Sequence, residues 1–246
     1  MDLKRQQRCL DTLVDVDRPL EPGGTVLDFG CGAGHGVSGF RQLGYRAFGA
    51  DISLAVEVAG LEDPDGDVFR LIEMETYRVP FPADTFDFVY SEGVFEHVNN
   101  YGEAFSEIHR VLKPGGTSIH LFPARWRVIE GHVFVPFAGA IRNRPWLLVW
   151  ALLGVRNQYQ KGKSARDVAA GNERYLREDC TYYTAAEIRR LASEVFGDEV
   201  SFVELPVAKN QFRARRHIYP LMRALPVLVP LVRHFHMRAL MVEKRA

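Results

Sequence analysis

A glycine-rich turn directly after a short apolar run constrains this chain more than any other feature. The turn lies in the segment Val26-Leu27-Asp28-Phe29-Gly30-Cys31-Gly32-Ala33-Gly34-His35-Gly36. The segment begins like a buried strand and ends like the start of a helix. Glycines at such a point let the backbone approach a ligand closely, and the following helix offers its first amide groups. We therefore predict a ligand site at the carboxyl end of this strand.

The spacing of these glycines does not fit the dinucleotide-binding pattern G-x-G-x-x-G. Counted from Gly30 the last position is His35, and counted from Gly32 it is Val37. A carboxylate at Asp28 would repel a pyrophosphate but suits a cationic ligand that carries an amine. Asp51 ends the next predicted strand, where an acidic side chain can accept hydrogen bonds from both hydroxyls of a ribose.

Strands and helices alternate along most of the chain. We predict strands at 25–29, 46–50, 68–72, 86–90, 117–122, 200–205 and 239–243, and helices at 2–17, 35–43, 53–60, 100–112 and 184–196. This order predicts an α/β fold with a doubly wound, Rossmann-like, seven-stranded and mostly parallel sheet that carries helices on both faces.

The alternation divides the chain into three parts. Residues 1–122 are expected to form a cofactor-binding core of an N-terminal helix and the first five strands. Residues 123–183, where the alternation breaks down, are expected to be an inserted substrate cap. Residues 184–246 complete the core and contain a basic, apolar and proline-rich insertion at about 206–236.

Composition excludes several other classes of protein. The 246 residues include 31 basic and 31 acidic side chains, so the chain has no net charge with which to coat a nucleic acid. Cys9, Cys31 and Cys180 are scattered, which argues against a disulfide framework and a structural zinc site, and we expect no metal. The longest apolar run, 146–155, is half of the roughly 20 residues that a spanning helix needs. We expect a cytoplasmic protein.

Five ordered segments resemble the motifs of class I S-adenosylmethionine-dependent methyltransferases. The first is the D-x-G-x-G-x-G turn that begins at Asp28. The others are Gly49-Ala50-Asp51-Ile52-Ser53, Val79-Pro80-Phe81-Pro82-Ala83-Asp84-Thr85-Phe86-Asp87-Phe88-Val89, Ser91-Glu92-Gly93-Val94-Phe95-Glu96-His97-Val98 and Glu107-Ile108-His109-Arg110-Val111-Leu112-Lys113-Pro114-Gly115-Gly116. The resemblance covers residues 25–122 and implies methyl transfer from S-adenosyl-L-methionine, with S-adenosyl-L-homocysteine as product.

The resemblance also assigns roles to individual residues. The methionine part of the cofactor is expected against Asp28 and the backbone of Gly30, Cys31, Gly32 and Gly34, and the ribose against Asp51 and Ile52. Glu75, beside Thr76, takes the position of the acidic residue that meets the adenine amino group. Ser91 and Glu92 are expected near the amino-acid end and the methyl group. Arg8 either meets the cofactor carboxylate or is a solvated surface residue.

Methyl transfer needs little covalent help, because the sulfonium already activates the methyl group and the protein has only to align the nucleophile. A hydroxyl acceptor usually also needs a base. Our candidates are His97 and His132, with Glu92 as a third choice. The alternative for His97 is a hydrogen bond to nearby backbone at the start of a helix.

Predictions of the acceptor come from the cap and from the C-terminal region. All three tryptophans lie in the cap, and residues 205–246 carry nine basic side chains against one acidic side chain. We favour O-methylation of a glycan, a lipid-linked sugar or a specialised metabolite, and second an aromatic, quinone or polyketide acceptor. A third hypothesis is a non-catalytic docking domain.

Partner predictions follow from the same regions. Nucleic acid is disfavoured, because Ser91-Glu92-Gly93-Val94 lacks the Asn/Asp-Pro-Pro-Tyr/Phe motif of enzymes that methylate its amino groups. The basic and apolar insertion at 206–236 suggests peripheral contact with the inner membrane face. We expect a monomer or a homodimer.

Overall fold

The computed structural model describes residues 3–54, 67–210 and 218–246. In this part of the chain the strands are β1 (Thr25–Phe29), β2 (Arg46–Asp51), β3 (Phe69–Leu71), β4 (Phe86–Glu92), β5 (Leu112–Pro123), β6 (Val200–Phe202) and β7 (Met237–Glu243). They form one seven-stranded sheet in the order β3-β2-β1-β4-β5-β7-β6. The first five strands are parallel, and β7 runs antiparallel to both of its neighbours. The predicted fold class is confirmed.

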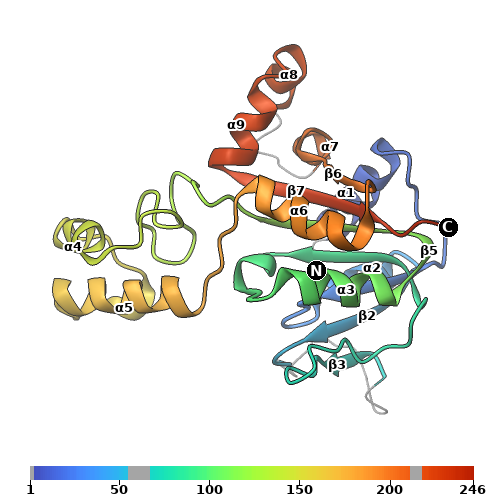
Figure 1. Cartoon of the computed structure of the whole chain (residues 1–246), viewed down its shortest axis with the longest axis horizontal. Coiled ribbons are helices and arrows are strands. Elements are labelled where there is room, and N and C mark those ends of the chain that lie inside the picture. Colours follow the sequence, from blue (N-terminus) through green and yellow to red (C-terminus); the bar gives the residue numbers. More distant parts are fainter. Residues whose placement is uncertain (1–2, 55–66, 211–217) are drawn as a thin grey trace.

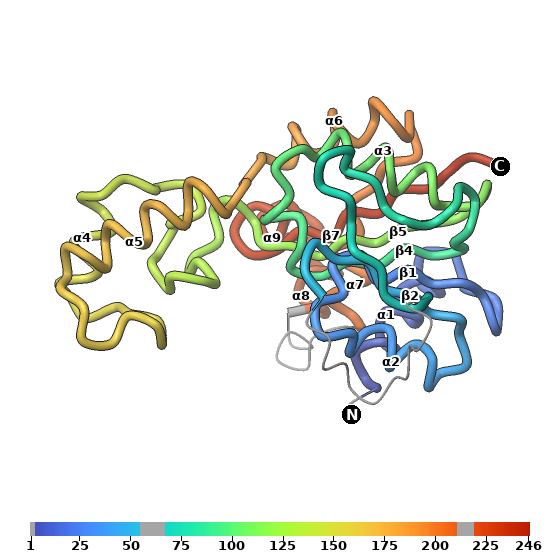
Figure 2. The backbone as a smooth tube through the Cα atoms, turned by 90° about the horizontal axis from the view of Figure 1, so that it is seen from below, coloured from blue at the N-terminus to red at the C-terminus, as the bar shows by residue number. Residues whose placement is uncertain are grey.

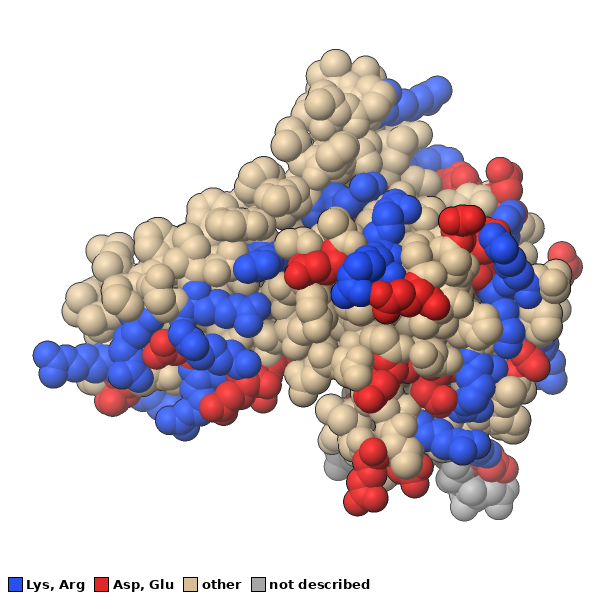
Figure 3. All heavy atoms as spheres, viewed as in Figure 1, with Lys and Arg blue, Asp and Glu red and all other residues tan. Residues whose placement is uncertain are grey.

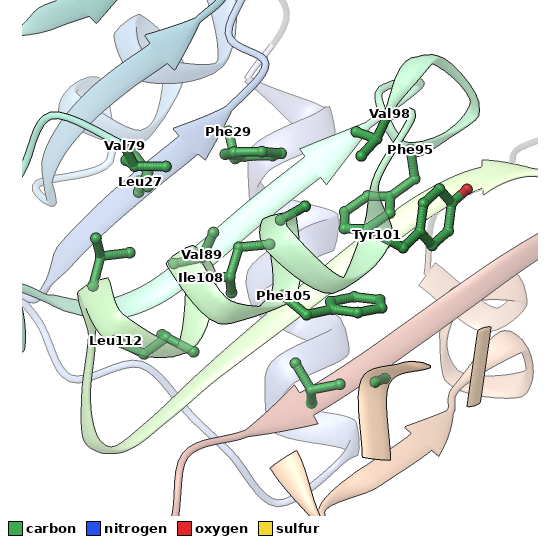
Figure 4. Close-up of a cluster of buried hydrophobic side chains, with 14 of the residues drawn as sticks. Leu27, Phe29, Val79, Val89, Phe95, Val98, Tyr101, Phe105, Ile108 and Leu112 are labelled. Atoms are coloured by element: carbon green, nitrogen blue, oxygen red, sulfur yellow. The ribbon is translucent and has the colours of Figure 1, made fainter. Parts of the chain in front are cut away.

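Helices cover both faces of the sheet (Figures 1 and 2). One face packs against α1 (Lys4–Asp15), α2 (His35–Gln42) and α7 (Glu204–Asn210). The other packs against α3 (Tyr101–Val111) and α6 (Ala185–Phe196). Figure 4 shows aromatic side chains of α3 and of the short 3₁₀ turn Phe95–His97 packed together at the end of β4. Phe95 contacts Tyr101 and Phe105 with ring centroids 4.9 and 5.2 Å apart, so this packing fixes the turn that carries His97.

Residues between β5 and α6 form an arm that extends away from the sheet (Figures 1 and 2). Its helices are α4 (Arg144–Leu152) and α5 (Ala165–Glu178), with a 3₁₀ turn at Gln158–Gln160 between them. The sequence analysis missed both helices. The α4 sequence is apolar on nearly all sides and therefore lacks a helical alternation of polar and apolar residues. The arm has a small apolar core of its own that includes Val133, Leu147 and Leu176.

The predicted strand at 200–205 is wrong beyond Phe202, because α7 begins at Glu204. Pro206 has no amide hydrogen for a ladder hydrogen bond, but it is tolerated in the first turn of a helix. The Glu204 carboxylate is buried and accepts hydrogen bonds from Arg233, at 2.9 and 2.8 Å. This charged pair holds α7 against the helix that precedes β7.

The rest of the proline-rich insertion is broken into two short helices, α8 (Ile218–Ala224) and α9 (Leu228–Phe235), which are separated at Pro226. Other boundaries differ less from the prediction. The fifth strand begins at Leu112 rather than Thr117, and α3 ends at Val111. The helix predicted at 53–60 lies almost wholly outside the described residues.

A buried histidine connects two central strands. His120 of β5 is fully buried, and its Nδ1 and Nε2 lie 2.8 Å from Ser91 Oγ and 3.0 Å from Ser118 Oγ. Burial lowers the pKa of His120 to about 3. Because the unfolded chain takes up this proton near pH 6.5, the imidazole opposes folding as the pH falls from about 6.5 towards 3.

The substitution His120→Gln should therefore flatten the acid side of the stability profile. We expect wild type to lose up to about 1.4 kcal/mol more unfolding free energy per pH unit than the variant between pH 6 and pH 4. Urea denaturation at several pH values measures this difference. The exposed residue His35 provides the control, since His35→Gln should leave the slope unchanged. Parallel profiles for wild type and His120→Gln would contradict the assignment.

Candidate functional site

The turn after β1 is fixed by contacts that leave no room for a side chain. Gly30 has a φ of +77°, and its amide donates to the carbonyl of Ala50 at 2.7 Å. A Cβ at Gly30 would lie 2.3 Å from Val94 Cγ2. The turn is therefore held between the end of β2 and the loop after β4.

Asp51 connects the same turn to the end of β2. Its Oδ2 accepts a hydrogen bond from the amide of Gly32 at 2.7 Å, and its Oδ1 accepts one from the amide of Ser53 at 3.1 Å. A carboxylate has about four acceptor positions, so each oxygen can accept a further hydrogen bond from a ligand.

A cavity of about 370 Å³ lies at the carboxyl edge of the sheet. It is lined by Phe29, Gly30, Asp51, Ile52, Ile72, Met74, Tyr77, Gly93, Val94, His97, Val98, Asn99, Asn100 and Glu103. The chain leaves β1 towards β2 on one side and returns to β4 on the other, so this edge is the switch point where open α/β sheets bind ligands. Ile52 and Met74 are 59% and 55% exposed, which gives the cavity apolar walls open to a flat ligand.

The structure distributes the predicted cofactor residues around this cavity in different ways. Gly30, Asp51 and Ile52 line it directly, as does the candidate base His97. Glu75 and Thr76 are exposed on the turn between the bridged residues Glu73 and Arg78, and the neighbouring Met74 and Tyr77 are the ones that line the cavity.

Cys31, Gly32 and Gly34 form the turn beside the cavity, and Gly34 caps α2 with a φ of +73°. Asp28 is buried behind this turn.

Ser91 and Glu92 point to opposite faces of the sheet, as neighbouring residues of a strand must. The side chain of Ser91 is fully buried beside His120. Glu92 accepts hydrogen bonds from Arg5 Nε at 2.7 Å and from the Tyr90 hydroxyl at 2.5 Å. Arg5 thus reaches the strand end from α1, whereas the sequence analysis considered Arg8 for a cation at this edge.

Asp28 is a buried acid next to two others. Burial raises the pKa of Asp28 to about 7, against the opposing charge of Arg5 and with further help from the negative charges of Asp51 and Glu92. One of its oxygens lies so close to α2 that a Cβ at Gly36 would be 2.1 Å away. An amine placed beside Asp28 would favour the ionised form.

The two candidate bases, 35 residues apart in sequence, lie together where the arm meets the core. The ring centroids of His97 and His132 are 5.0 Å apart. His97 Nδ1 lies 2.7 Å from the carbonyl oxygen of Asp179, so its backbone partner belongs to the arm and not to the nearby backbone considered from the sequence. The arm is fixed here, since the amide of Thr181 donates to the carbonyl of Glu96 at 2.7 Å.

A buried carboxylate orients His132. Glu130 is 1% exposed and accepts hydrogen bonds from His132 Nδ1, the amides of His132 and Val133, and the Tyr182 hydroxyl, all at 2.7–2.8 Å. Burial alone would raise the pKa of Glu130, but these hydrogen bonds lower it to about 2. The hydrogen bond between His132 Nδ1 and Glu130 also raises the pKa of His132.

A second cavity, of about 510 Å³, lies on the arm side of His132. Its lining includes Phe134, Asn157, Tyr159, Lys163 and Tyr175. His97 lines the first cavity and His132 the second, so the pair of rings stands between them. Both histidines and the aromatic side chain of Tyr175 were predicted from the sequence, but Glu130 was not, since nothing in the local sequence indicates that it meets them.

The pKa of Asp28 gives a test of the site that needs no ligand. Since the folded protein keeps this proton up to about pH 7 and the unfolded chain releases it near pH 4, wild type should lose stability as the pH rises through that interval. Asp28→Asn should remove the loss and be more stable than wild type at pH 8 by up to a few kcal/mol.

Urea denaturation at pH 4 and pH 8 measures the difference. Asp198→Asn is the control, because that side chain is fully exposed. If the unfolding free energies of Asp28→Asn and wild type differ by the same amount at both pH values, Asp28 is not the titrating group.

Known proteins resemble this chain in the region that carries the first cavity. Residues 27–120 match the methyltransferase domain family. Malonyl-[acyl-carrier protein] O-methyltransferase of Yersinia pestis is 32% identical over 94 residues, which make up 38% of this chain and 34% of that protein. Ubiquinone biosynthesis O-methyltransferase of Bradyrhizobium sp. (strain ORS 278) is 34% identical over 127 residues, 51% of this chain and 47% of that protein.

The fold comparison extends over nearly the whole chain. The structure of Haemonchus contortus phosphoethanolamine N-methyltransferase 2 in complex with S-adenosyl-L-methionine covers 98% of this chain and 53% of that chain, with a TM-score of 0.54 and 14% identity. This chain spans less than half of the length of the two curated relatives named above, at 34% and 47%. Residues 27–120 therefore match a methyltransferase domain, and they lie within a mostly parallel, Rossmann-like seven-stranded sheet.

Proposed function

We propose that this chain is an S-adenosyl-L-methionine-dependent methyltransferase that acts on a small-molecule acceptor. The observation that carries the proposal is the cavity at the switch point of the sheet, which is built mostly from the domain that matches known methyltransferases. The relatives are named for O-methylation of malonyl-[acyl-carrier protein] and for ubiquinone biosynthesis, and neither role is assigned to this chain.

The residues around the cavity fit this cofactor. Asp51 can accept hydrogen bonds from the ribose hydroxyls while it keeps those from Gly32 and Ser53. The exposed side chains of Ile52 and Met74 offer apolar contact to a purine ring. When bound, the cofactor supplies a methyl group activated by its sulfonium.

The amino-acid end of the cofactor carries both an amine and a carboxylate, and this protein has groups for each. Asp28 and Glu92 lie near the turn together with Asp51. The repulsion that Asp51 and Glu92 exert on Asp28 is offset when a cation binds beside them. Arg5 is the basic group at the same edge. Ser91 is left to a structural role through His120, because its side chain is fully buried and lies 2.8 Å from the imidazole.

The arm is proposed to hold the acceptor, as a substrate cap over residues 123–183. It brings the second cavity up to His97 and His132, next to the edge of the cofactor cavity. We favour O-methylation of a glycan, a lipid-linked sugar or a specialised metabolite, with His97 or His132 taking the proton of an acceptor hydroxyl. The aromatic lining by Phe134, Tyr159 and Tyr175 supports the alternative of a ring-bearing acceptor such as a quinone or polyketide.

Calorimetric titration with S-adenosyl-L-methionine, S-adenosyl-L-homocysteine and NAD tests the proposal. We expect micromolar binding of both sulfur compounds and no binding of NAD, because the acidic edge and the glycine spacing disfavour a pyrophosphate. A folded protein that binds neither sulfur compound would favour the non-catalytic docking domain over the enzyme.

The same titration tests the ribose assignment through Asp51→Ala. Loss of hydrogen bonds to a charged group should weaken binding by about 1–3 kcal/mol, or roughly 5- to 150-fold. Asp198→Ala, at a fully exposed position, should bind as wild type does. Unchanged affinity in Asp51→Ala would show that the ribose lies elsewhere.

We also propose that α8 and α9 dock on a membrane surface, but through apolar contact more than through charge. Val227, Leu231 and Leu221 are 70%, 49% and 51% exposed, and Figure 3 shows the projecting α8–α9 pair largely free of charged side chains.

Much of the basic charge predicted for lipid binding is already paired, since Arg233, Lys209 and Lys244 contact acidic side chains. Arg213, Arg215 and Arg216 lie outside the described residues. No described helix is both long enough and apolar enough to cross a bilayer.

Sedimentation with phosphatidylcholine vesicles, with and without phosphatidylglycerol, tests this docking. We expect the protein to sediment with both, and the double substitution Val227→Asp and Leu231→Asp to reduce the bound fraction severalfold, because charge at these positions opposes insertion. Leu152→Asp removes an equally exposed apolar side chain from the arm and serves as the control. Equal sedimentation of wild type and the double variant would rule out this surface.

A further inference from the structure

We propose that Glu96, His97 and His132 bind one divalent transition-metal ion of the Zn²⁺ type at the junction between the core and the arm. A potential ligand atom on each of the three residues lies within 4.8 Å of the others. Two residues come from the 3₁₀ turn after β4 and the third from the arm, so the site exists only in the folded chain. The sequence analysis expected no metal.

Both histidine rings are oriented as metal ligands are in proteins. A carbonyl oxygen only accepts hydrogen bonds, so the 2.7 Å contact with Asp179 places the proton of the neutral His97 ring on Nδ1. The Glu130 carboxylate does the same for Nδ1 of His132 at 2.7 Å. In the neutral form each ring therefore presents the lone pair of Nε2. Metal-binding histidines typically donate their other N–H to a carbonyl or a carboxylate in this way.

Glu96 supplies a separate indication of a missing ligand. The side chain is 4% exposed, and its Oε2 is buried with no hydrogen-bond partner among the described residues. A buried carboxylate oxygen without a partner is costly. A cation between the three groups would satisfy the orphaned oxygen.

The donor set indicates the kind of ion. Two imidazoles and one carboxylate suit Zn²⁺ and similar first-row ions, and they leave coordination positions open. Bonds of about 2.0–2.2 Å place ligand atoms no more than about 4.4 Å apart. The three ligand atoms lie within 4.8 Å of one another, so any pair that is farther apart than the bound geometry allows must close onto the ion. The His97 ring is exposed and the His132 side chain is 31% exposed, so both have room to move.

The proposed position of the ion indicates a role in activating the acceptor, and this part of the inference rests on the proposed function. His97 lines the cofactor cavity and His132 lines the arm cavity, so an open coordination position would face an acceptor near both. An oxygen bound to such an ion loses its proton more readily. The two rings would then act as ligands, and the ion would replace them in activating an acceptor hydroxyl.

Titration of the full chain with Zn²⁺ alone, after removal of metal with a chelator, tests the binding. We expect one equivalent to bind. Long-range ¹H–¹⁵N spectra of the imidazoles should show the Nε2 resonances of two of the eight histidines shifting with that equivalent. The proposal is overturned if no Zn²⁺ binds, or if the resonances that shift belong to histidines other than His97 and His132.

Substitutions localise the site. His132→Gln and Glu96→Gln should each weaken Zn²⁺ binding by at least about 10- to 100-fold, the loss typical even for residues that only support a ligand. His109→Gln changes a histidine that packs on Phe196 at the far end of α3 and should bind Zn²⁺ as wild type does. Wild-type affinity in His132→Gln would overturn the proposal.

S-adenosyl-L-methionine binding, measured on the same samples, separates this inference from the proposed function. His132 does not line the cofactor cavity, so His132→Gln should lose Zn²⁺ and retain the cofactor. Cofactor binding without Zn²⁺ binding in wild type would reject the metal site alone. Zn²⁺ binding without cofactor binding would reject the proposed function and leave the metal site in place.

Discussion

The close approach of backbone to side chains around the turn after β1 is the constraint on which the rest of this site depends. A Cβ at Gly30 would lie 2.3 Å from Val94, and a Cβ at Gly36 would lie 2.1 Å from Asp28. The first contact joins β1 to the loop after β4, and the second joins it to α2. Because both spaces are already filled, the ends of β1 and β4 and the start of α2 can meet only where glycine occurs. The cofactor cavity opens beside this junction.

Electrostatics then give the edge of the sheet its preference for a ligand. The negative charges of Asp51 and Glu92 act on Asp28 there, and the positive charge of Arg5 opposes them. The sheet and the turn hold the Asp28 carboxylate in its buried position, so the folded protein bears the free-energy cost of removing it from water. A cationic group beside it relieves that cost, whereas a pyrophosphate would increase it.

The arm depends on a different kind of interaction. A buried carboxylate at Glu130 gathers donors from His132, Val133 and Tyr182, and so folds a loop that contains no regular secondary structure. The backbone hydrogen bond between Thr181 and Glu96 then joins the arm to the turn after β4. Through these contacts, residues far apart in the chain form the boundary between two cavities.

The sequence by itself determined the layered fold and the glycine turn at the edge where we propose the cofactor site, because both follow from local patterns. Apolar runs alternating with amphipathic helices specify a parallel sheet, and the glycines after β1 need only their own neighbours to form a turn. The sequence did not reveal α4, which is apolar on nearly all sides, or α5, whose apolar side is buried in the small core of the arm.

Only the tertiary structure decided which side chains meet. The alternation of side chains along β4 turns Ser91 towards His120 and its neighbour Glu92 towards the opposite face. The packing of α1 brings Arg5 to Glu92 at the end of β4. The meeting of His97 with His132, and the buried oxygen of Glu96 beside them, depends on where the arm returns to the core. No local pattern encodes such convergence, because it is set by the packing of segments that are distant in the chain.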